Sequence, residues 1–282
     1  MRRPDDMAAR EVPEGMESPL AFAVAEQTRN TMNMVRNALD RQDVVLAFQP
    51  VVQGARPDTV VFHEGLIRIL DETGRAIPAR DFIDSVETST LGRKIDCLAL
   101  EMGLSALARN PALRLSINMS ARSIGSPQWM RVLSDGLRAD ATVGERLILE
   151  VTESSAMLLP DLVCAFMRDQ QCKGISFALD DFGAGHTSFR YLREFYFDLV
   201  KIDGQFIRGI AHNPDNQVLT EALMSISRHF DMFTVAESVE TAEDATFLQT
   251  IGIDCMQGYY FGAPTLQPPW LTPLPQRSLQ AG

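Results

Sequence analysis

The sequence repeats one alternation along most of its length: a short apolar run typical of a β-strand, then a segment with helical spacing. Eight such runs occur: VVLAFQP (44–50), VVFHEGLIRI (60–69), LRLSINM (113–119), RLILEVT (146–152), ISFALDD (175–181), DLVKID (198–203), FTVAE (233–237) and DCMQGYYF (254–261). Helical patterns separate most of them, over residues 93–109, 159–172, 217–230 and 241–251. Strands that alternate with helices favour a parallel sheet, and eight of them close into a barrel. We therefore predict an α/β fold, a TIM-type (β/α)8 barrel.

The first connection departs from this alternation. Residues 51–59 separate the first two runs and are too few for a crossover helix. Parallel neighbours need a connection of about a dozen residues or more, whereas antiparallel neighbours do not. We therefore expect the first strand of the barrel to be antiparallel.

The two ends of the chain differ in composition from its centre. Residues 1–16 are polar and charged, and the spacing of Met32, Val35 and Leu39 suits a helix over residues 18–40. Five prolines follow from Pro264 onward. We divide the chain into a flexible lead with the start of a helix (1–26), the barrel (27–266) and a Pro-rich irregular tail (267–282). We expect the N-terminal segment to cover the bottom of the barrel, with a partner-docking helix as the alternative.

The composition excludes several classes of protein. The formal net charge is −11, and an acidic chain without a basic stripe is a poor ligand for a nucleic-acid duplex. No apolar run reaches the roughly 18 residues of a membrane span. The four cysteines form no CxxC pair and are expected to be free thiols. We therefore expect a cytoplasmic protein that binds neither duplex nucleic acid nor the bilayer core.

Each predicted strand carries a polar group near its C-terminal end. In a barrel these ends meet at one face, where barrel enzymes place their chemistry. The sequence thus predicts one pocket shared by residues that are far apart along the chain. These residues are Glu64, Asn118, Glu150, Asp180, Asp181, Lys201, Glu237 and Gln257.

Five of these groups are carboxylates, which would repel one another unless cations were present. Carboxylate and amide oxygens are hard ligands that suit Mg²⁺ or Mn²⁺. The adjacent Asp180 and Asp181 can serve two ions, and a pair of ions is a recurrent arrangement for cleaving phosphodiesters. Taken singly, each group also has a structural explanation: a turn, a helix cap, an exposed strand residue or a snorkelling lysine. Recurrence at successive strand ends favours a site.

The ordered series of motifs resembles the EAL domain family of bacterial cyclic di-GMP phosphodiesterases. The matching segments are FQPVV (48–52), EGLIR (64–68), INMSAR (117–122), LEVTES (149–154), LDDFGAGHTS (179–188), LVKIDGQF (199–206), VAESVET (235–241) and MQGYYFG (256–262). The resemblance implies hydrolysis of cyclic di-GMP to linear pGpG by two divalent metal ions, Mg²⁺ or Mn²⁺, at the C-terminal face of the barrel.

The resemblance also implies a role for each matched residue. One ion would be held by Glu64, Asn118, Glu150 and Asp180, and the second by Asp180, Asp181 and Glu237. Lys201 would hold the attacking water or the phosphate, and Glu237 would help to deprotonate that water. The substrate would be bound by Gln49, Leu66, Arg68, Asp203, Glu240 and Gln257. Glu153 would anchor the loop over residues 182–188 to the metal site.

The chain departs from the family pattern without losing a metal ligand. Gly65 occupies the middle of the Glu-Ala-Leu motif, Ile69 and Asp84 replace a tryptophan and a proline, and Ala184, His186 and Ser238 replace a threonine, a tyrosine and a glycine. The changes at Ala184 and His186 bear on how well the loop is ordered and on how it couples the two chains of a homodimer. A non-hydrolytic cyclic di-GMP receptor or protein-interaction module is the alternative reading, because degenerate relatives typically lose ligands of the first metal.

Overall fold

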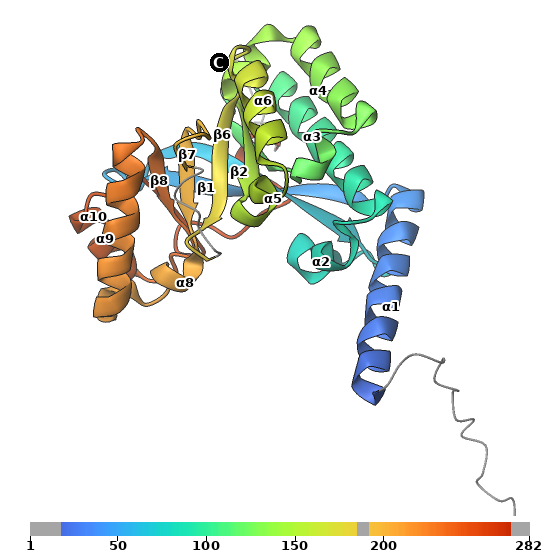
Figure 1. Ribbon diagram of the computed structural model, residues 1–282, viewed down its shortest axis with the longest axis horizontal. Helices are drawn as coiled ribbons and strands as arrows, with labels where there is room; N and C mark the ends of the chain where they lie inside the picture. The colour runs from blue at the N-terminus through green and yellow to red at the C-terminus, as the bar shows by residue number, and fades with distance from the viewer. Residues whose placement is uncertain (1–17, 185–191, 272–282) are drawn as a thin grey trace, which may run out of the picture.

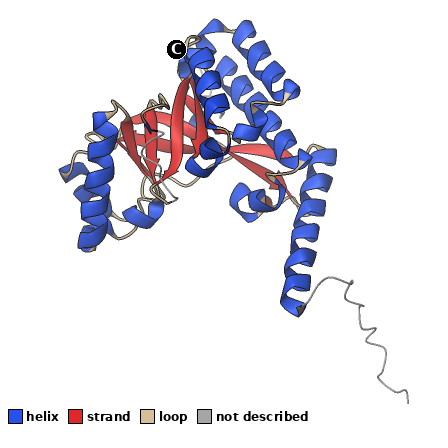
Figure 2. Cartoon of the chain, viewed as in Figure 1, coloured by secondary structure: helices blue, strands red, loops and turns tan. Residues whose placement is uncertain are grey.

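The computed structural model describes residues 18–184 and 192–271, and it contains a closed barrel surrounded by helices (Figures 1 and 2). Eight strands form the ring: β1 (Val44–Gln53), β2 (Val60–Leu70), β4 (Leu115–Asn118), β5 (Leu147–Thr152), β6 (Ser176–Phe182), β7 (Leu199–Ile202), β8 (Phe233–Ala236) and β9 (Cys255–Gln257). The predicted barrel is thus confirmed. A short strand, β3 (Ala76–Pro78), pairs with β2 outside the ring.

The first strand is antiparallel, as the short connection predicts. β1 pairs antiparallel with β2 on one side and with β9 on the other, whereas the remaining neighbours in the ring are parallel. The long β1–β2 ribbon extends beyond the ring, toward α1 and α2 in Figure 1. Side chains from β2 therefore reach the mouth of the barrel from the middle of the strand and not only from its end.

Helices cover the outside of the parallel part of the ring. They are α3 (Thr90–Arg109), α4 (Pro127–Ala139), α5 (Glu153–Leu158), α6 (Pro160–Gln171), α8 (Gly204–Ile207), α9 (Pro214–His229) and α10 (Ala242–Thr250), with α2 (Ile83–Val86) beside β3. Four of the longer ones begin at a side-chain cap, namely Ser89, Ser126, Asn213 and Thr241. Helix α4 lies in a stretch for which the sequence pattern predicted no helix.

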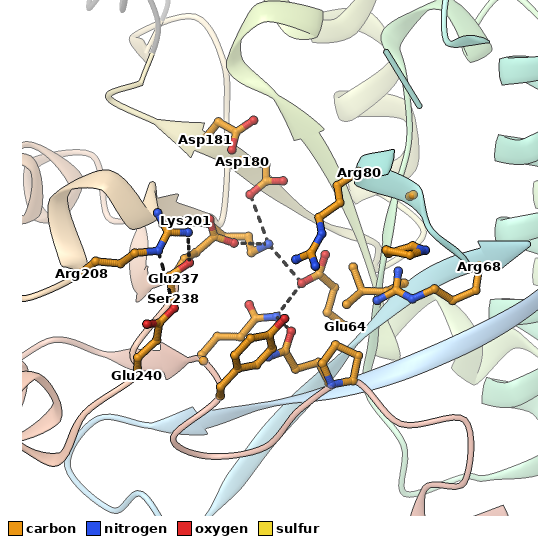
Figure 3. Close-up of a pocket in the computed structure, with 18 residues that line it drawn as sticks. Glu64, Arg68, Arg80, Asp180, Asp181, Lys201, Arg208, Glu237, Ser238 and Glu240 are labelled. Atoms are coloured by element: carbon orange, nitrogen blue, oxygen red, sulfur yellow. Dashed lines mark hydrogen bonds and ion pairs between the residues drawn. The ribbon is translucent and has the colours of Figure 1, made fainter. Parts of the chain in front are cut away.

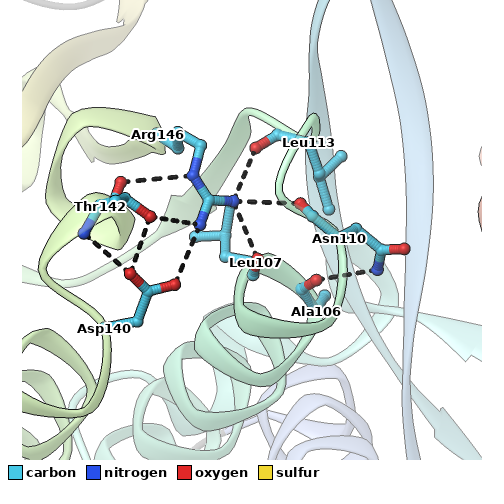
Figure 4. Close-up of polar contacts among 7 residues, drawn as sticks. All are labelled: Ala106, Leu107, Asn110, Leu113, Asp140, Thr142 and Arg146. Atoms are coloured by element: carbon cyan, nitrogen blue, oxygen red, sulfur yellow. Dashed lines mark hydrogen bonds and ion pairs between the residues drawn. The ribbon is translucent and has the colours of Figure 1, made fainter.

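A partly buried arginine, Arg146, connects the end of α3 to the start of β5 (Figure 4). The Nη1 atom of Arg146 donates to the carbonyl oxygens of Leu107 at 2.8 Å, Asn110 at 3.1 Å and Leu113 at 3.2 Å. The last carbonyls of a helix lack partners within the helix, so this contact satisfies them and favours a cation there. Because β5 begins at the next residue, the contact also fixes the height of Glu150 in the barrel.

Helix α1 (Pro19–Arg41) begins at the cap Ser18, whose Oγ accepts from the amide of Ala21. It packs against α2 and β2 and projects away from the ring in Figure 1. A cavity of about 450 Å³ opens at the bottom of the barrel, and none of the described residues that line it belongs to α1. Helix α1 therefore does not cover the bottom, since Ala38 and Asp43 connect its end to Leu70 at the opposite end of β2. The predicted flexible lead, residues 1–16, lies outside the described residues.

The described part of the tail packs on the outer face of β1. Thr265 exchanges backbone hydrogen bonds with Phe48, and the ring of Trp270 lies 5.5 Å from that of Phe48 and 4.3 Å from that of His63. The β1–β2 hairpin has no crossover helix, so this segment covers part of its outer surface. The remainder of the predicted irregular tail, residues 272–282, lies outside the described residues.

Apolar side chains fill the interior of the barrel below its mouth. They form a layer of buried residues from the strands of the ring: Val51, Phe62, Ile148, Ala178, Leu199, Val235 and Cys255. We call this set the apolar layer. All four cysteines are free, as predicted. In the two described ranges, no helix is both long and apolar enough to cross a bilayer.

Candidate active site

A buried lysine lies at the centre of the barrel mouth, directly above the apolar layer. Side chains alternate along β7, so Lys201 points inward on the same side as Leu199. Only 1% of Lys201 is exposed. Its Nζ atom lies 2.8 Å from Glu150, and 2.7 Å, 3.2 Å and 3.4 Å from Glu237, Asp180 and Glu64. Figure 3 shows the last three side chains around Lys201. Burying an ammonium group is costly unless anions pair with it, and four carboxylates do so here.

The sequence pattern predicted that Glu64 lies near a strand end. In the structure it lies in the middle of β2. The strand continues to Leu70 because β1 and β3 still provide backbone partners there. The Nδ2 atom of Asn118 donates to one oxygen of Glu64 at 2.7 Å, and Gln257 donates to the other at 2.6 Å. Burial tends to raise the pKa of Glu64, but the charge of Lys201 and these hydrogen bonds outweigh it and hold the pKa below its usual value.

A β-bulge brings two consecutive carboxylates to the same cavity. The pairing of β6 with β7 shifts register between Leu179 and Phe182, and Asp181 has a left-handed backbone with a φ of 57°. In a regular strand Asp180 and Asp181 would point to opposite faces. Here both line the cavity, and ligand atoms of Asp180, Asp181 and Glu237 lie within 4.8 Å of one another. This acidic cluster could hold a metal ion.

The carboxylates outnumber the cation that neutralises them. Burial raises the pKa of Glu150 to about 8, with contributions from the charges of Glu64 and Asp180. Burial, with Asp180 and Glu64, also raises the pKa of Glu237 well above its usual value. Burial and the neighbouring Asp180 raise the pKa of Asp181 to about 6. Without further cations, the site therefore holds protons near neutral pH, and divalent ions would displace them.

The donor set fits hard divalent cations. One carboxylate oxygen of Glu150, Oε1, is buried and has no hydrogen-bond partner among the described residues. An orphaned carboxylate oxygen in a group of carboxylates and one amide is what a Mg²⁺ or Mn²⁺ ligand set contains. The predicted ligands thus converge on one place, around Lys201.

Most of the predicted substrate-binding residues line a single cavity of about 410 Å³ at the barrel mouth. They are Gln49, Leu66, Arg68, Glu240 and Gln257. Asp203 does not line it. Its side chain caps α8 by accepting from the amide of Gln205 at 2.6 Å, and it contributes to the raised pKa of Asp181. The structure therefore places Asp203 behind Asp181, away from the cavity surface.

The predicted loop anchor contacts the beginning of its loop. Glu153 is buried, and its Oε2 atom accepts a hydrogen bond of 3.4 Å from the amide of Gly183, just after the bulge. The amide of Ala184 donates to the backbone carbonyl of Asp181, and this hydrogen bond closes the turn. His186 and the rest of the loop to residue 191 lie outside the described residues.

Three further residues at the cavity escape the strand pattern. Arg80, Arg208 and Tyr259 line it from turns that follow β3, α8 and β9. The recurrence of polar groups at strand ends carries no information about side chains in such turns. The guanidinium of Arg208 donates to the hydroxyl of Ser238 at 3.0 Å and lies 3.7 Å from Glu240.

Comparison with known proteins agrees with this geometry. The EAL domain model matches residues 32–264. The chain is 32% identical over 259 residues to the cyclic di-GMP phosphodiesterase PdeF of Escherichia coli, covering 89% of this chain and 34% of that protein. It is 31% identical to the cyclic di-GMP phosphodiesterase PdeB of Shewanella oneidensis, covering 82% and 27%. The chain thus spans about a third of the length of these relatives.

Solved structures show the same fold. The PaMucR phosphodiesterase in complex with c-di-GMP has a TM-score of 0.74 at 28% identity, over 84% of this chain and 97% of that one. The FimX EAL domain from Pseudomonas aeruginosa, bound to c-di-GMP, has a TM-score of 0.76 at 23% identity, over 84% and 97%, and supports the fold alone. With the family model matching most of the barrel, the chain belongs to the EAL domain family.

Proposed function

We propose that this chain hydrolyses cyclic di-GMP to linear pGpG. The observation that carries the proposal is the convergence of Asp180, Asp181 and Glu237 to within 4.8 Å, beside a lysine that four carboxylates contact. The names of PdeF and PdeB support the substrate, because these relatives are cyclic di-GMP phosphodiesterases. The PaMucR phosphodiesterase, with its bound c-di-GMP, supports the same ligand.

The site would work with two divalent ions, Mg²⁺ or Mn²⁺. Glu64, Asn118, Glu150 and Asp180 would hold one of them, and Asp180, Asp181 and Glu237 the other. When bound, such ions supply Lewis-acid charge that lowers the pKa of a water molecule and offsets the charge of the phosphate being cleaved.

Lys201 would act as a fixed positive charge beside the reacting phosphate. Burial tends to lower its pKa, but Asp180, Glu150, Glu237 and Glu64 raise the pKa of Lys201 well above its usual value. The side chain therefore stays protonated and donates hydrogen bonds, so it cannot be the base. Preorganised charge of this kind favours the transition state, in which negative charge accumulates on the phosphate oxygens.

Glu237 would accept the proton of the attacking water. Its carboxylate lies at the cavity surface and contacts Lys201 at 2.7 Å. Water would add to phosphorus, the bond from phosphorus to the 3′ oxygen would break, and the proton would pass to that oxygen. The products of this step are a 5′ phosphate and a 3′ hydroxyl, which is the linear dinucleotide pGpG.

The cavity wall would orient the substrate. Gln49 is held by two contacts: its amide nitrogen donates to the carbonyl of Gly262, and its oxygen accepts from Gln257. Leu66 offers an apolar surface from β2, and Arg68 follows on the same inward face. A guanidinium makes charge-assisted, bidentate contacts to phosphate.

Incubation of the protein with cyclic di-GMP and Mg²⁺ or Mn²⁺, followed by chromatography, tests the proposal. We expect pGpG to accumulate, and excess chelator to stop it. A protein that binds cyclic di-GMP tightly but never forms pGpG with either ion would instead be a receptor. The retention of every metal ligand favours the hydrolase over that alternative.

A further inference from the structure

A second positively charged region, separate from Lys201, lies at one end of the cavity. Pro78 of β3 pairs with Arg68 of β2, and the chain turns after β3 through Ala79–Asp81. This hairpin brings Arg80 to the same end of the cavity as Arg68. Figure 3 shows the Arg80 side chain reaching toward Glu64 from one side, with Arg68 beside it. Both arginines line the cavity.

Neither guanidinium is closely paired with an acid. The Nη1 atom of Arg68 donates to the carbonyl of Ile67 at 3.0 Å, and Arg68 forms no ion pair with a carboxylate in residues 18–184 and 192–271. Arg80 lies 3.7 Å from Asp81, whose side chain is exposed, and Tyr259, which also lines the cavity, raises the pKa of Arg80. Solvent screens such an exposed pair, so it engages the guanidinium weakly.

The charge of Arg80 acts on Arg68 across this end of the cavity. Burial lowers the pKa of Arg68, and the charge of Arg80 is the next contribution in the same direction. An anion between them would relieve this repulsion. Arg208, at the other side of the cavity, differs because its guanidinium donates to the hydroxyl of Ser238 at 3.0 Å; its 3.7 Å contact with the exposed Glu240 is screened like that of Arg80 with Asp81. The free binding capacity for an anion therefore lies at the Arg68–Arg80 end.

The proposed substrate has a group that matches this place. A cyclic dinucleotide carries two phosphodiesters, and only one is cleaved in each event. The acidic cluster with its ions would take the phosphate that is cleaved. The second phosphate needs a cation, since the rest of the inner cavity wall is rich in carboxylates.

We propose that Arg80, together with Arg68, binds the phosphate that is not cleaved, and that Tyr259 positions Arg80 for this contact. The inference rests on the proposed function, because it assumes a cyclic dinucleotide in the cavity. It makes Arg80 a specificity residue: the protein would favour a substrate with two phosphates over a diester with one.

Titration calorimetry with cyclic di-GMP in Ca²⁺ tests the contact without turnover. We expect Arg80→Met to weaken affinity about tenfold, the scale of a charge-assisted hydrogen bond, and Arg80→Lys to restore part of the loss. Arg75→Met is the matched control, because the Arg75 and Arg80 side chains are both 75% exposed and Arg75 lies outside the cavity on the same hairpin. Unchanged affinity in Arg80→Met would overturn the proposal.

Turnover of two substrates separates this contact from the metal site. With Mn²⁺, Arg80→Met should raise KM for cyclic di-GMP about tenfold and leave the hydrolysis of bis(p-nitrophenyl) phosphate, which has one phosphate, at the parent rate. An equal loss with both substrates would place Arg80 at the reacting phosphate and refute the second-phosphate contact. If the parent binds cyclic di-GMP but hydrolyses neither compound, the proposed hydrolysis fails, and the calorimetric comparison still decides the role of Arg80. If the parent binds no cyclic di-GMP, both proposals fall.

Discussion

The guanidinium of Arg208 donates a 3.0 Å hydrogen bond to the hydroxyl of Ser238, and Ser238 holds a left-handed backbone with a φ of 56°. That conformation costs a residue with a Cβ about 1 kcal/mol or more, whereas glycine adopts it freely. Ser238 directly follows Glu237, so the hydrogen bond helps to hold a strained segment next to a proposed metal ligand.

Substitution of Ser238 separates the strain from the hydrogen bond. We expect Ser238→Ala to lower the free energy of unfolding by about 1 kcal/mol, because the strain stays while the hydrogen bond is lost. Ser238→Gly should cost clearly less, since relief of the strain offsets the lost bond. Urea unfolding of both variants measures the difference. Equal destabilisation of the two would show that the left-handed backbone stores no strain here.

Removal of the ammonium group at position 201 should affect rate and metal-free stability together. Lys201→Met keeps the approximate shape, and we expect hydrolysis of cyclic di-GMP to slow at least about a hundredfold while binding in Ca²⁺ persists. Without metal, the variant should lose about 3 kcal/mol of stability, because buried carboxylates lose their partner. Mg²⁺ should then raise the melting temperature of the variant more than that of the parent. Parent-rate turnover in the variant would exclude Lys201 from the chemistry.

Loss of the amide at position 118 tests the ligand set. Asn118→Ala removes a proposed metal ligand and the donor that contacts Glu64 at 2.7 Å. We expect turnover to be abolished and Mn²⁺ affinity, measured by calorimetry, to fall at least about tenfold, with the far-ultraviolet circular dichroism unchanged. Full activity in this variant, or in excess chelator, would contradict the two-metal proposal.

A buried acid behind the site predicts a pH dependence of stability. Asp96 of α3 accepts from the amide of Ser120 and the hydroxyl of Ser123, and burial raises the pKa of Asp96 to about 6. In the unfolded chain this acid titrates near its usual pKa of 3.8. Its contribution to stability is therefore complete below pH 3.8 and is lost as the pH rises through about 6, when the buried group must ionise.

The difference between the parent and Asp96→Asn isolates this group from the other buried carboxyls. Between pH 4 and pH 7.5, the variant should gain up to about 3 kcal/mol of unfolding free energy relative to the parent. Urea unfolding across this range gives the two curves. Parallel curves would mean that Asp96 titrates alike in the folded and unfolded states.

The sequence predicts the ring and the inward lysine because both depend on regular alternation. Side chains alternate along a strand, so Lys201 shares the face of Leu199, and a short first connection excludes a crossover. The position of Glu64 in mid-strand could not be predicted in this way, since it depends on the partners that prolong β2. Nor could the bulge at Asp180 and Asp181, which arises from a register shift between two strands.

The arginines that line the cavity from turns could not be predicted from the strand pattern. Arg80 reaches the cavity because β3 folds back on β2, and the alternation of strands and helices does not indicate this hairpin. Helix α4 is not among the helical ranges named from the sequence, although Ser126 and Pro127 give it a clear beginning. Turn geometry and tertiary pairing, which decide both cases, lie outside any single-strand pattern.

The apolar layer beneath Lys201 determines how the proposed ions and substrate would reach the site. It separates the carboxylates from the cavity at the bottom of the barrel, so within the described residues ions and nucleotide reach the site through the same mouth. In the proposed reaction, a nucleotide lying over Asp180 and Glu237 would obstruct the route by which an ion leaves. Ions would therefore load first and depart last, and each round of catalysis would exchange the nucleotide while the ions stay in place.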